Sequence, residues 1–338
     1  MAATTLLFIA AFLFYCLHPT EAQIGVCYGK IGDNLPSSQD VVNLYKSNGI
    51  KAMRLYFPDQ DTLQALQGTN IELMLGVANE NIESLASCSC AAKRWVRRNV
   101  LPFGSLIKYV VVGNEINPSD KQASSVLPAM QNIIYALNAS QNSNNLNDEI
   151  KVSTAINTNL IKNSYPPSNG QFQDLSYITP IIDFLNSNDS PLLVNIYPYF
   201  AYINDTQHIS LDYALFNAPE VVFTDPNNGL DYKNLLDAMV DSVYAALRKA
   251  GANHPRVIVS ESGWPSRGGS AATMDNAKAY YENLANHVKQ GTPLMAGQPI
   301  ETYLFAMFDE NQKQGASSER NFGIFYPNQQ SKYGQLNF

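Results

Sequence analysis

The stretch IKYVVVGNE, residues 107–115, is a run of apolar residues that ends on a carboxylate. A second stretch of this kind, RVIVSES at residues 256–262, carries Glu261 near its end. In a parallel barrel, functional side chains lie at the carboxyl ends of the strands. Glu115 and Glu261 can therefore face each other across one cleft, although 146 residues separate them along the chain (261 minus 115).

The rest of the chain repeats this strand pattern. Eight apolar runs predict strands: IGVCY from Ile24, KAMRLY from Lys51, IELMLGV from Ile71, IKYVVVGNE from Ile107, KVSTAI from Lys151, LLVNIYPY from Leu192, RVIVSES from Arg256 and ETYLFAMF from Glu301. Between most of them, apolar residues recur at the spacing of a helix. Alternating strands and helices predict a parallel sheet, and eight such units favour a closed (β/α)8 TIM barrel of class α/β.

The alternative to a barrel is an open, doubly wound sheet. No GxGxxG sequence follows the first predicted strand, and the chain has no Walker-type lysine motif, so the phosphate-binding loops typical of open sheets are missing. The segment 200–230, rich in Asn, Asp and Pro, is too long for a simple turn. We expect a single domain in which this segment forms a small excursion on the catalytic face.

The composition excludes several classes of protein. With 338 residues, 45% hydrophobic and 15% charged, the chain can bury one large core and is too apolar to be disordered. Its net charge of −7 argues against a nucleic-acid partner, because binding phosphates needs clustered Lys and Arg, and we expect no such cluster here. A neutral polysaccharide fits this composition better.

The two ends of the chain predict its location. Residues 1–22 have the pattern of a signal peptide, with an apolar run from Leu6 to Leu17 that is too short to span a bilayer. Removal of this segment leaves a catalytic domain of residues 23–338 and no membrane anchor. Because the sequence stops at Phe338 without a hydrophobic extension, we expect a secreted, extracellular protein. Asn138, Asn188 and Asn204 begin glycosylation sequons, which suit this route.

Three cysteines remain after the predicted cleavage. Cys27 lies in a predicted strand and is expected to be a buried thiol. Cys88 and Cys90 are too close in sequence for an unstrained mutual bridge, and the sequence leaves the state of these two cysteines open. A zinc site needs four ligands, and no histidine clusters with these thiols. We therefore expect neither a metal nor a cofactor.

Glu115 and Glu261 are the candidates for acid–base chemistry. A glycosidase needs one protonated carboxyl group for the leaving oxygen and one ionised carboxylate for the sugar carbon. An arbitrary glutamate at a strand end is more often structural. Here both follow apolar runs and both have small polar neighbours, such as Asn114 and Ser260, that can bond a carboxylate or a sugar hydroxyl.

The motifs VVVGNE, VSESGWPS and FAMFDENQK, with QIGVCYG and NIYPYF, resemble those of the plant β-1,3-glucanases of glycoside hydrolase family 17. The resemblance runs from Gln23 to the end of the chain. It implies a barrel whose proton donor follows strand four and whose nucleophile follows strand seven, with retention of anomeric configuration. Carried over, Glu115 is the proton donor and Glu261 the nucleophile. The strand count from the sequence gives these two glutamates the same places.

The resemblance also implies a supporting pair, Glu310 and Lys313, in DENQK after the eighth strand. We expect this carboxylate and ammonium to bind sugar hydroxyls and to tune the two working acids, the alternative being a surface ion pair. Glu319 matches a recurrent glutamate of the family that is expected to be structural. Arg54, two residues before Tyr56, is predicted to point into the barrel and hold Glu261 ionised, or else to form a lone salt bridge on the barrel floor.

Aromatic rings near the strand ends are candidates for packing on sugars. We single out Tyr56, Tyr197 and Phe200 as cleft residues. Aromatic residues of a barrel more often belong to the core, and this reading fits the others better. These others are Tyr28, Tyr199 and Trp264.

Three functions are consistent with these residues. The first is a monomeric endo-hydrolase of β-1,3-glucan that works by double displacement, with carboxyl groups about 5 Å apart. The second is a hydrolase of mixed-linkage 1,3-1,4-β-glucan, because related barrels share the motifs and differ in their loops. The third is a glucan-binding protein without useful activity, against which the intact carboxylates and lysine argue.

Overall fold

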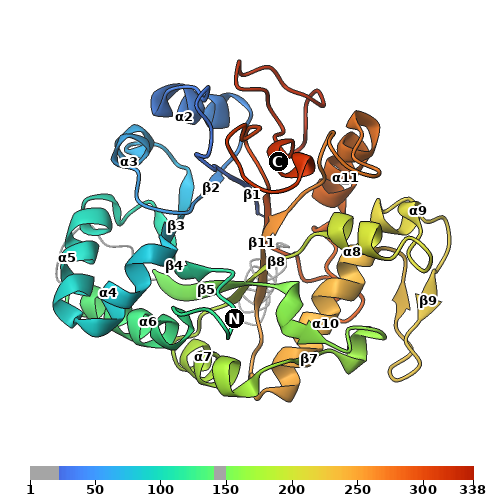
Figure 1. Cartoon of the computed structure of the whole chain (residues 1–338), viewed down its shortest axis with the longest axis horizontal. Helices are drawn as coiled ribbons and strands as arrows, with labels where there is room; N and C mark the ends of the chain where they lie inside the picture. Colours follow the sequence, from blue (N-terminus) through green and yellow to red (C-terminus); the bar gives the residue numbers. More distant parts are fainter. Residues whose placement is uncertain (1–22, 141–149) are drawn as a thin grey trace, which may run out of the picture.

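The computed structural model describes residues 23–140 and 150–338. Within them, eight parallel strands form a closed barrel with helices around the outside (Figure 1). The barrel strands are β1 (Ile24–Cys27), β2 (Ala52–Leu55), β3 (Glu72–Val77), β4 (Ile107–Asn114), β5 (Lys151–Asn157), β8 (Leu192–Asn195), β11 (Val257–Ser262) and β12 (Thr302–Leu304). All eight predicted strands and the TIM barrel are confirmed. The predicted signal peptide, residues 1–22, lies outside the described residues.

The barrel closes because β1 pairs in parallel with both β2 and β12. In chain order each strand hydrogen-bonds to the next one of the barrel, so every carboxyl end opens at the same face. Burial explains the apolar strand sequences, since side chains on both sides of these strands are covered. All six residues of β11 are buried, for example.

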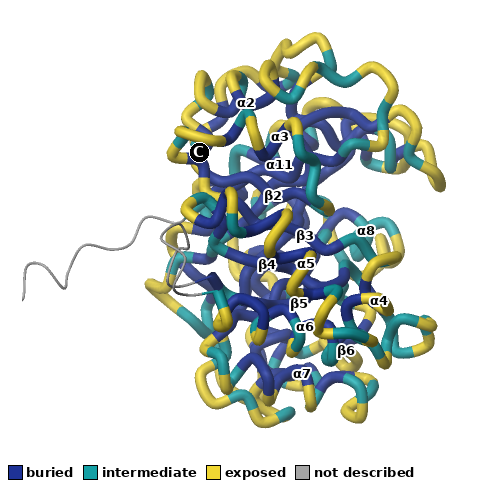
Figure 2. The backbone as a smooth tube through the Cα atoms, turned by 90° about the vertical axis from the view of Figure 1, so that its left-hand side faces the viewer, coloured by how far each residue is buried: buried dark blue, intermediate teal, exposed yellow. Residues whose placement is uncertain are grey.

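Helices cover the outside of the barrel. They are α2 (Ser38–Ser47), α3 (Gln60–Leu66), α4 (Ile82–Ser87), α5 (Ser89–Asn99), α6 (Ala123–Asn138), α7 (Leu175–Ser187), α8 (Pro198–Asn204), α9 (Leu211–Ala214), α10 (Leu235–Lys249) and α11 (Met274–His287). Capping side chains define several of their starts. Ser37, Asp59, Asp174 and Thr273 each accept a hydrogen bond from the first turn of the helix that follows. The inner faces are buried and the outer faces exposed (Figure 2).

The predicted excursion around residues 200–230 is confirmed. It contains α8, α9 and a hairpin of two short strands, β9 (Phe223–Thr224) and β10 (Asp231–Tyr232). A second hairpin, which the sequence did not predict, follows β5 and consists of β6 (Ile161–Lys162) and β7 (Gln171–Phe172). The two hairpins contact each other through the aromatic rings of Tyr165 and Phe223, whose centroids are 5.1 Å apart. Strands of two residues have no periodicity to detect, so sequence patterns miss them.

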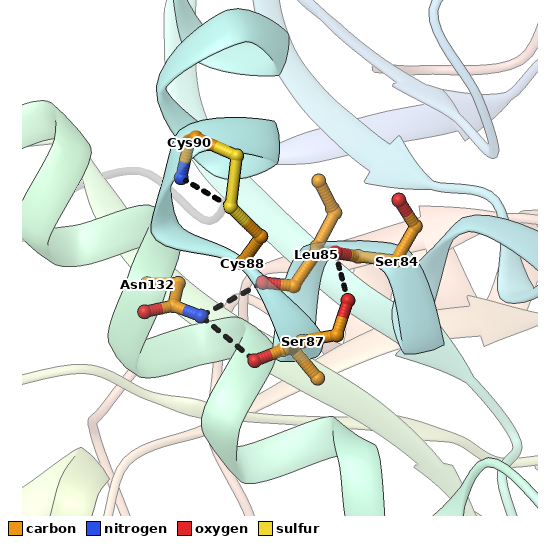
Figure 3. Close-up of a disulfide and its surroundings, with 7 residues drawn as sticks. Ser84, Leu85, Ser87, Cys88, Cys90 and Asn132 are labelled. Carbon is orange, nitrogen blue, oxygen red and sulfur yellow. Dashed lines mark hydrogen bonds between the residues drawn. A yellow bond between two sulfur atoms is a disulfide. The ribbon is translucent and has the colours of Figure 1, made fainter.

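The structure shows the state of the two cysteines that the sequence left open. Cys88 and Cys90 form a disulfide, in the sharp turn between α4 and α5 (Figure 3). Cys88 is extended there and caps α5, which brings the two Cα atoms to 5.1 Å, inside the range that a bridge requires. The side chain of Asn132 on α6 holds the turn by donating to the carbonyls of Leu85 and Ala86. Cys27 is a free, buried cysteine, as predicted.

Gly76 in β3 leaves space for the backbone of β2 beneath the site. A Cβ at this position would lie 2.4 Å from the carbonyl oxygen of Tyr56, far inside contact distance. We expect Gly76→Ala to lower the free energy of unfolding by about 1–3 kcal/mol, because backbone atoms must shift. Denaturant unfolding of the purified protein measures this loss.

Gly32→Ala is the matched control for this substitution. Its Cβ would meet the side chain of Leu35 at 3.1 Å, and a side chain can move aside. The expected loss is under about 1 kcal/mol. Equal losses in the two variants would contradict the close approach at Gly76.

Candidate active site

Glu115 directly follows β4, in a stretch where the strand is irregular. The register of β4 against β5 shifts between Val111 and Asn114, which is a β-bulge. Gly113 (φ 87°) and Glu115 (φ 57°) both have left-handed backbone conformations. A bulge re-aims the side chains that follow it, and a non-glycine residue with positive φ is held there by its surroundings. The N–H of Glu115 donates to the carbonyl of Ala155 at 2.8 Å, which fixes this conformation.

Glu261 lies in β11, where a second bulge follows Val259. The side chain is buried and accepts three hydrogen bonds: Arg54 Nη1 (2.9 Å) and the Tyr56 hydroxyl (2.8 Å) donate to Oε1, and the Tyr197 hydroxyl (2.7 Å) donates to Oε2. Charged and hydroxyl donors at these distances stabilise a carboxylate and fix its position. Both oxygens of Glu261 are therefore oriented before any ligand arrives.

Asn195 links the two glutamates, and the sequence analysis missed it. This last residue of β8 donates from Nδ2 to Glu115 Oε1 (2.8 Å) and accepts from Arg54 Nη1 (2.9 Å) at Oδ1. Arg54 also donates from Nη2 to Asn114 Oδ1 (2.7 Å). The pattern that pointed to the glutamates could also have pointed to Asn195, because Asn195 is a polar residue at the carboxyl end of an apolar barrel strand.

The two carboxyl groups have different environments. Burial raises the pKa of Glu115, and the negative charge of Glu261 raises this pKa further. The hydrogen bond from Asn195 and the charges of Arg54 and Lys313 act in the opposite direction without cancelling the rise. A carboxyl group with a raised pKa keeps its proton at higher pH, and such a group can serve as a general acid.

Glu310 and Lys313 lie near the two glutamates, and the structure does not show the alternative that the sequence left open, an ion pair between Glu310 and Lys313. Lys313 Nζ makes its ion pair with Glu319 Oε2 at 3.2 Å, and both residues line the cavity described below. Glu310 is buried and accepts from the backbone N–H of Ile31 at 2.8 Å. Burial raises the pKa of Glu310. The chain turns after β12, so Glu310 and Lys313, three residues apart in the sequence, have different neighbours.

Aromatic rings surround Glu261. Tyr197 packs edge-on against Phe200, Phe305 and Phe322, with centroids 5.5–6.2 Å apart. Phe305 and Phe322 were not predicted, and Lys313 Nζ lies 4.3 Å from the ring centroid of Phe305. The remaining aromatic residues considered from the sequence are buried. These are Tyr28, Tyr199 and Trp264.

A cavity of about 1260 Å³ opens at these residues. Glu115 and Glu261 line it, and it continues between the hairpins β6–β7 and β9–β10 to residues such as Phe223 and Met239. A cavity of this size exceeds what one sugar needs and suits a chain of sugars. Other lining residues near the two glutamates are Asn195, Tyr197, Phe200, Phe305, Lys313, Glu319 and Phe322.

The structure shows neither a metal-binding cluster nor a membrane span in the part of the chain that it describes. No group of three His, Cys, Asp or Glu side chains there is placed to hold a metal ion. No helix among these residues is both long enough and apolar enough to cross a bilayer.

A barrel with two carboxyl groups at the carboxyl ends of strands four and seven has the arrangement that glycoside hydrolases use. Residues 24–338 match the model of glycosyl hydrolases family 17, and the chain belongs to this family. A glucan endo-1,3-beta-glucosidase of Vitis vinifera is 56% identical over 322 residues, which cover 93% of this chain and 91% of that protein.

Solved structures agree with this assignment. One of two plant beta-glucan endohydrolases with distinct substrate specificities superimposes with a TM-score of 0.87 at 42% identity, covering 93% of this chain and all (100%) of the other. CJP38, a beta-1,3-glucanase and allergen of Cryptomeria japonica pollen, gives a TM-score of 0.87 at 43% identity and covers 92% of this chain and 98% of its own. The chain is therefore a glycoside hydrolase.

Lys313→Met tests the electrostatics of the site. The positive charge of Lys313 lowers the pKa of Glu115, so its removal raises that pKa. Because a general acid works only while it is protonated, we expect the alkaline limb of kcat/KM to move to higher pH. A pH profile of hydrolysis measures the shift. Lys313→Arg keeps the charge and should leave the limb in place; a shift to lower pH in Lys313→Met would contradict the assignment.

Proposed function

We propose that this protein hydrolyses internal 1,3-β-D-glucosidic linkages of β-1,3-glucans with retention of anomeric configuration. The observation that carries the proposal is the linkage of Glu115 and Glu261 through Asn195 and Arg54 at one end of the barrel. The cavity at these residues has room for more than one sugar unit, which supports a polymeric substrate. The names of the relatives in grapevine and Cryptomeria japonica support the 1,3 linkage.

The reaction is a double displacement. A Glu261 carboxylate oxygen attacks the anomeric carbon, while the Glu115 carboxyl group gives its proton to the departing glycosidic oxygen. This step breaks the glycosidic bond and leaves a glucosyl ester on Glu261. Glu115, now ionised, takes a proton from water, and the water oxygen displaces Glu261 from the sugar. Both glutamates return to their starting states.

The surrounding residues prepare these two steps. Arg54, Tyr56 and Tyr197 hold the Glu261 carboxylate in place, and the same donors stabilise it again when it departs from the sugar. The raised pKa of Glu115 favours the protonated carboxyl group that the first step needs. After this step Glu261 is esterified and uncharged, so one cause of the raised pKa disappears. Glu115 then more readily stays ionised and acts as the base.

Replacing the nucleophile tests the proposal directly. We expect Glu261→Gln to lower kcat on a soluble linear β-1,3-glucan by at least about 10⁴-fold, because an amide cannot form the ester intermediate. Reducing-sugar release measures turnover, and circular dichroism checks the fold. Glu282→Gln, on the exposed side of α11, is the matched control and should keep full activity. A Glu261→Gln variant with most of its activity would remove Glu261 from this role.

Product analysis tests stereochemistry and substrate together. Proton NMR during the first minutes of hydrolysis should show the β-anomer of the new reducing end, as double displacement requires. The first product as α-anomer would refute the mechanism. Rates on linear β-1,3-glucan should exceed those on a mixed-linkage 1,3-1,4-β-glucan. The reverse ratio would transfer the proposal to the mixed-linkage substrate, and binding without product release would favour a glucan-binding protein.

We further propose that the mature protein, residues 23–338, is secreted to the apoplast as a monomer without a nucleic-acid partner. The signal-like pattern of residues 1–22 supports export. Among the sequons, Asn204 is exposed at the end of α8 and suits glycosylation. Asn188 is less suited, because its side-chain nitrogen already donates to the carbonyl of Phe184 at 2.7 Å.

A further inference from the structure

Helix α5 turns one uniformly positive side to solvent. Four exposed cations make up this surface, which we call the α5 cationic face: Lys93, Arg94, Arg97 and Arg98. The two apolar residues of the sequence KRWVRR, Trp95 and Val96, point inward and are buried, so they do not separate the four cations on the exposed side. The expectation that this acidic chain has no cluster of Lys and Arg is therefore wrong. The string KRWVRR already groups four cations in six residues, and the helix places them on one side of α5 with Trp95 and Val96 on the other.

The α5 cationic face has no acidic partners among residues 23–140 and 150–338. None of its four side chains forms an ion pair there, although the chain as a whole carries a net charge of −7. Lys93 instead lies over the ring of Tyr135 on α6, with Nζ 5.0 Å from the ring centroid. That ring is 56% exposed, so it extends the cationic face by an accessible aromatic surface.

Helix stability does not account for this arrangement. Arg97 and Arg98 lie in the last turn, where cations interact favourably with the helix dipole. Lys93 and Arg94 lie further in, and each stands four residues from another cation of the same face. Like charges at this spacing destabilise a helix. The contiguous positive side of α5 therefore lowers helix stability. A surface of this kind is suited to binding a negatively charged ligand.

We propose that the α5 cationic face binds an acidic polysaccharide whose negative charges are uronate carboxylates. Arginine binds a carboxylate through two parallel hydrogen bonds, and the cations form rows about 6 Å apart along the helix, one turn for each step. The exposed ring of Tyr135 offers a flat apolar surface on which a sugar ring can pack. A nucleic acid, with its denser charge, is repelled more strongly by the negative remainder of the protein.

The position of α5 keeps such a ligand away from the active site. Figure 1 shows α5 at the outer rim of the barrel, whereas the carboxyl ends of β4 and β11 lie near its centre. A bound acidic chain would hold the enzyme on a matrix and leave the cleft open. This inference does not rest on the proposed function, because none of the four cations of the α5 cationic face lines the cavity.

Binding to polygalacturonate, free of methyl esters, is the test. The wild-type protein should bind at about 0.01 M salt and dissociate by about 1 M, because the screening length falls from about 30 Å to 3 Å. The triple variant Arg94→Gln/Arg97→Gln/Arg98→Gln should bind about tenfold or more weakly. Its hydrolytic activity on a soluble glucan should not change. Calorimetric titration gives the affinities, and thermal unfolding checks that the variant is folded.

The control variant Lys46→Gln/Lys233→Gln/Lys289→Gln removes the same charge from three exposed lysines elsewhere and should keep wild-type affinity. If the triple arginine variant does not fold, Arg94→Gln/Arg98→Gln replaces it, with an intermediate loss expected. The inference is overturned if wild type does not bind, or if the control loses as much affinity as the arginine variant. Tighter binding of a single-stranded oligonucleotide than of polygalacturonate overturns the choice of ligand.

Discussion

The buried guanidinium of Arg54 is the constraint on which the site depends. A charge inside a barrel is tolerated only when its donors are satisfied, because removing an ion from water without partners is strongly unfavourable. Arg54 on β2 meets this requirement with oxygens of Asn114, Asn195 and Glu261, which come from β4, β8 and β11. One side chain thus fixes the relative positions of four strand ends. The same contacts fix the position of the Glu261 carboxylate and leave the side-chain nitrogen of Asn195 free to donate to Glu115.

The rigid barrel holds an irregular backbone at the two glutamates proposed to be catalytic. Glu115 has a left-handed conformation and Glu261 follows a bulge, and both features would be unstable in an isolated strand. Parallel neighbours on either side hold them through backbone hydrogen bonds. The irregular positions turn polar side chains toward the cavity while the residues before them, such as Val110 and Val259, remain in the core.

Charge is distributed unevenly over the molecule. Acidic side chains gather at the cavity, which is lined by Glu115, Glu261 and Glu319. Arg54 forms an ion pair with Glu261, and Lys313 forms one with Glu319. Basic side chains gather on α5, on the outside of the barrel. The first group acts at short range on protonation, and the second, which has no acidic partner among residues 23–140 and 150–338, presents a positive field to solvent. The average composition hides both, because it sums charges that the fold places on separate surfaces.

The sequence by itself determined the barrel and the two glutamates. Eight apolar runs separated by helical patterns specify a parallel closed sheet, and the parallel arrangement brings Glu115 and Glu261 to one face whatever their distance in sequence. Tertiary structure alone decided the partners. Asn195 became the link between the glutamates, Lys313 formed an ion pair with Glu319, and Cys88 bonded to Cys90 in a turn. The physical reason is range: periodicity reflects burial along one segment, whereas hydrogen bonds and ion pairs depend on ångström-scale positions set by several segments at once.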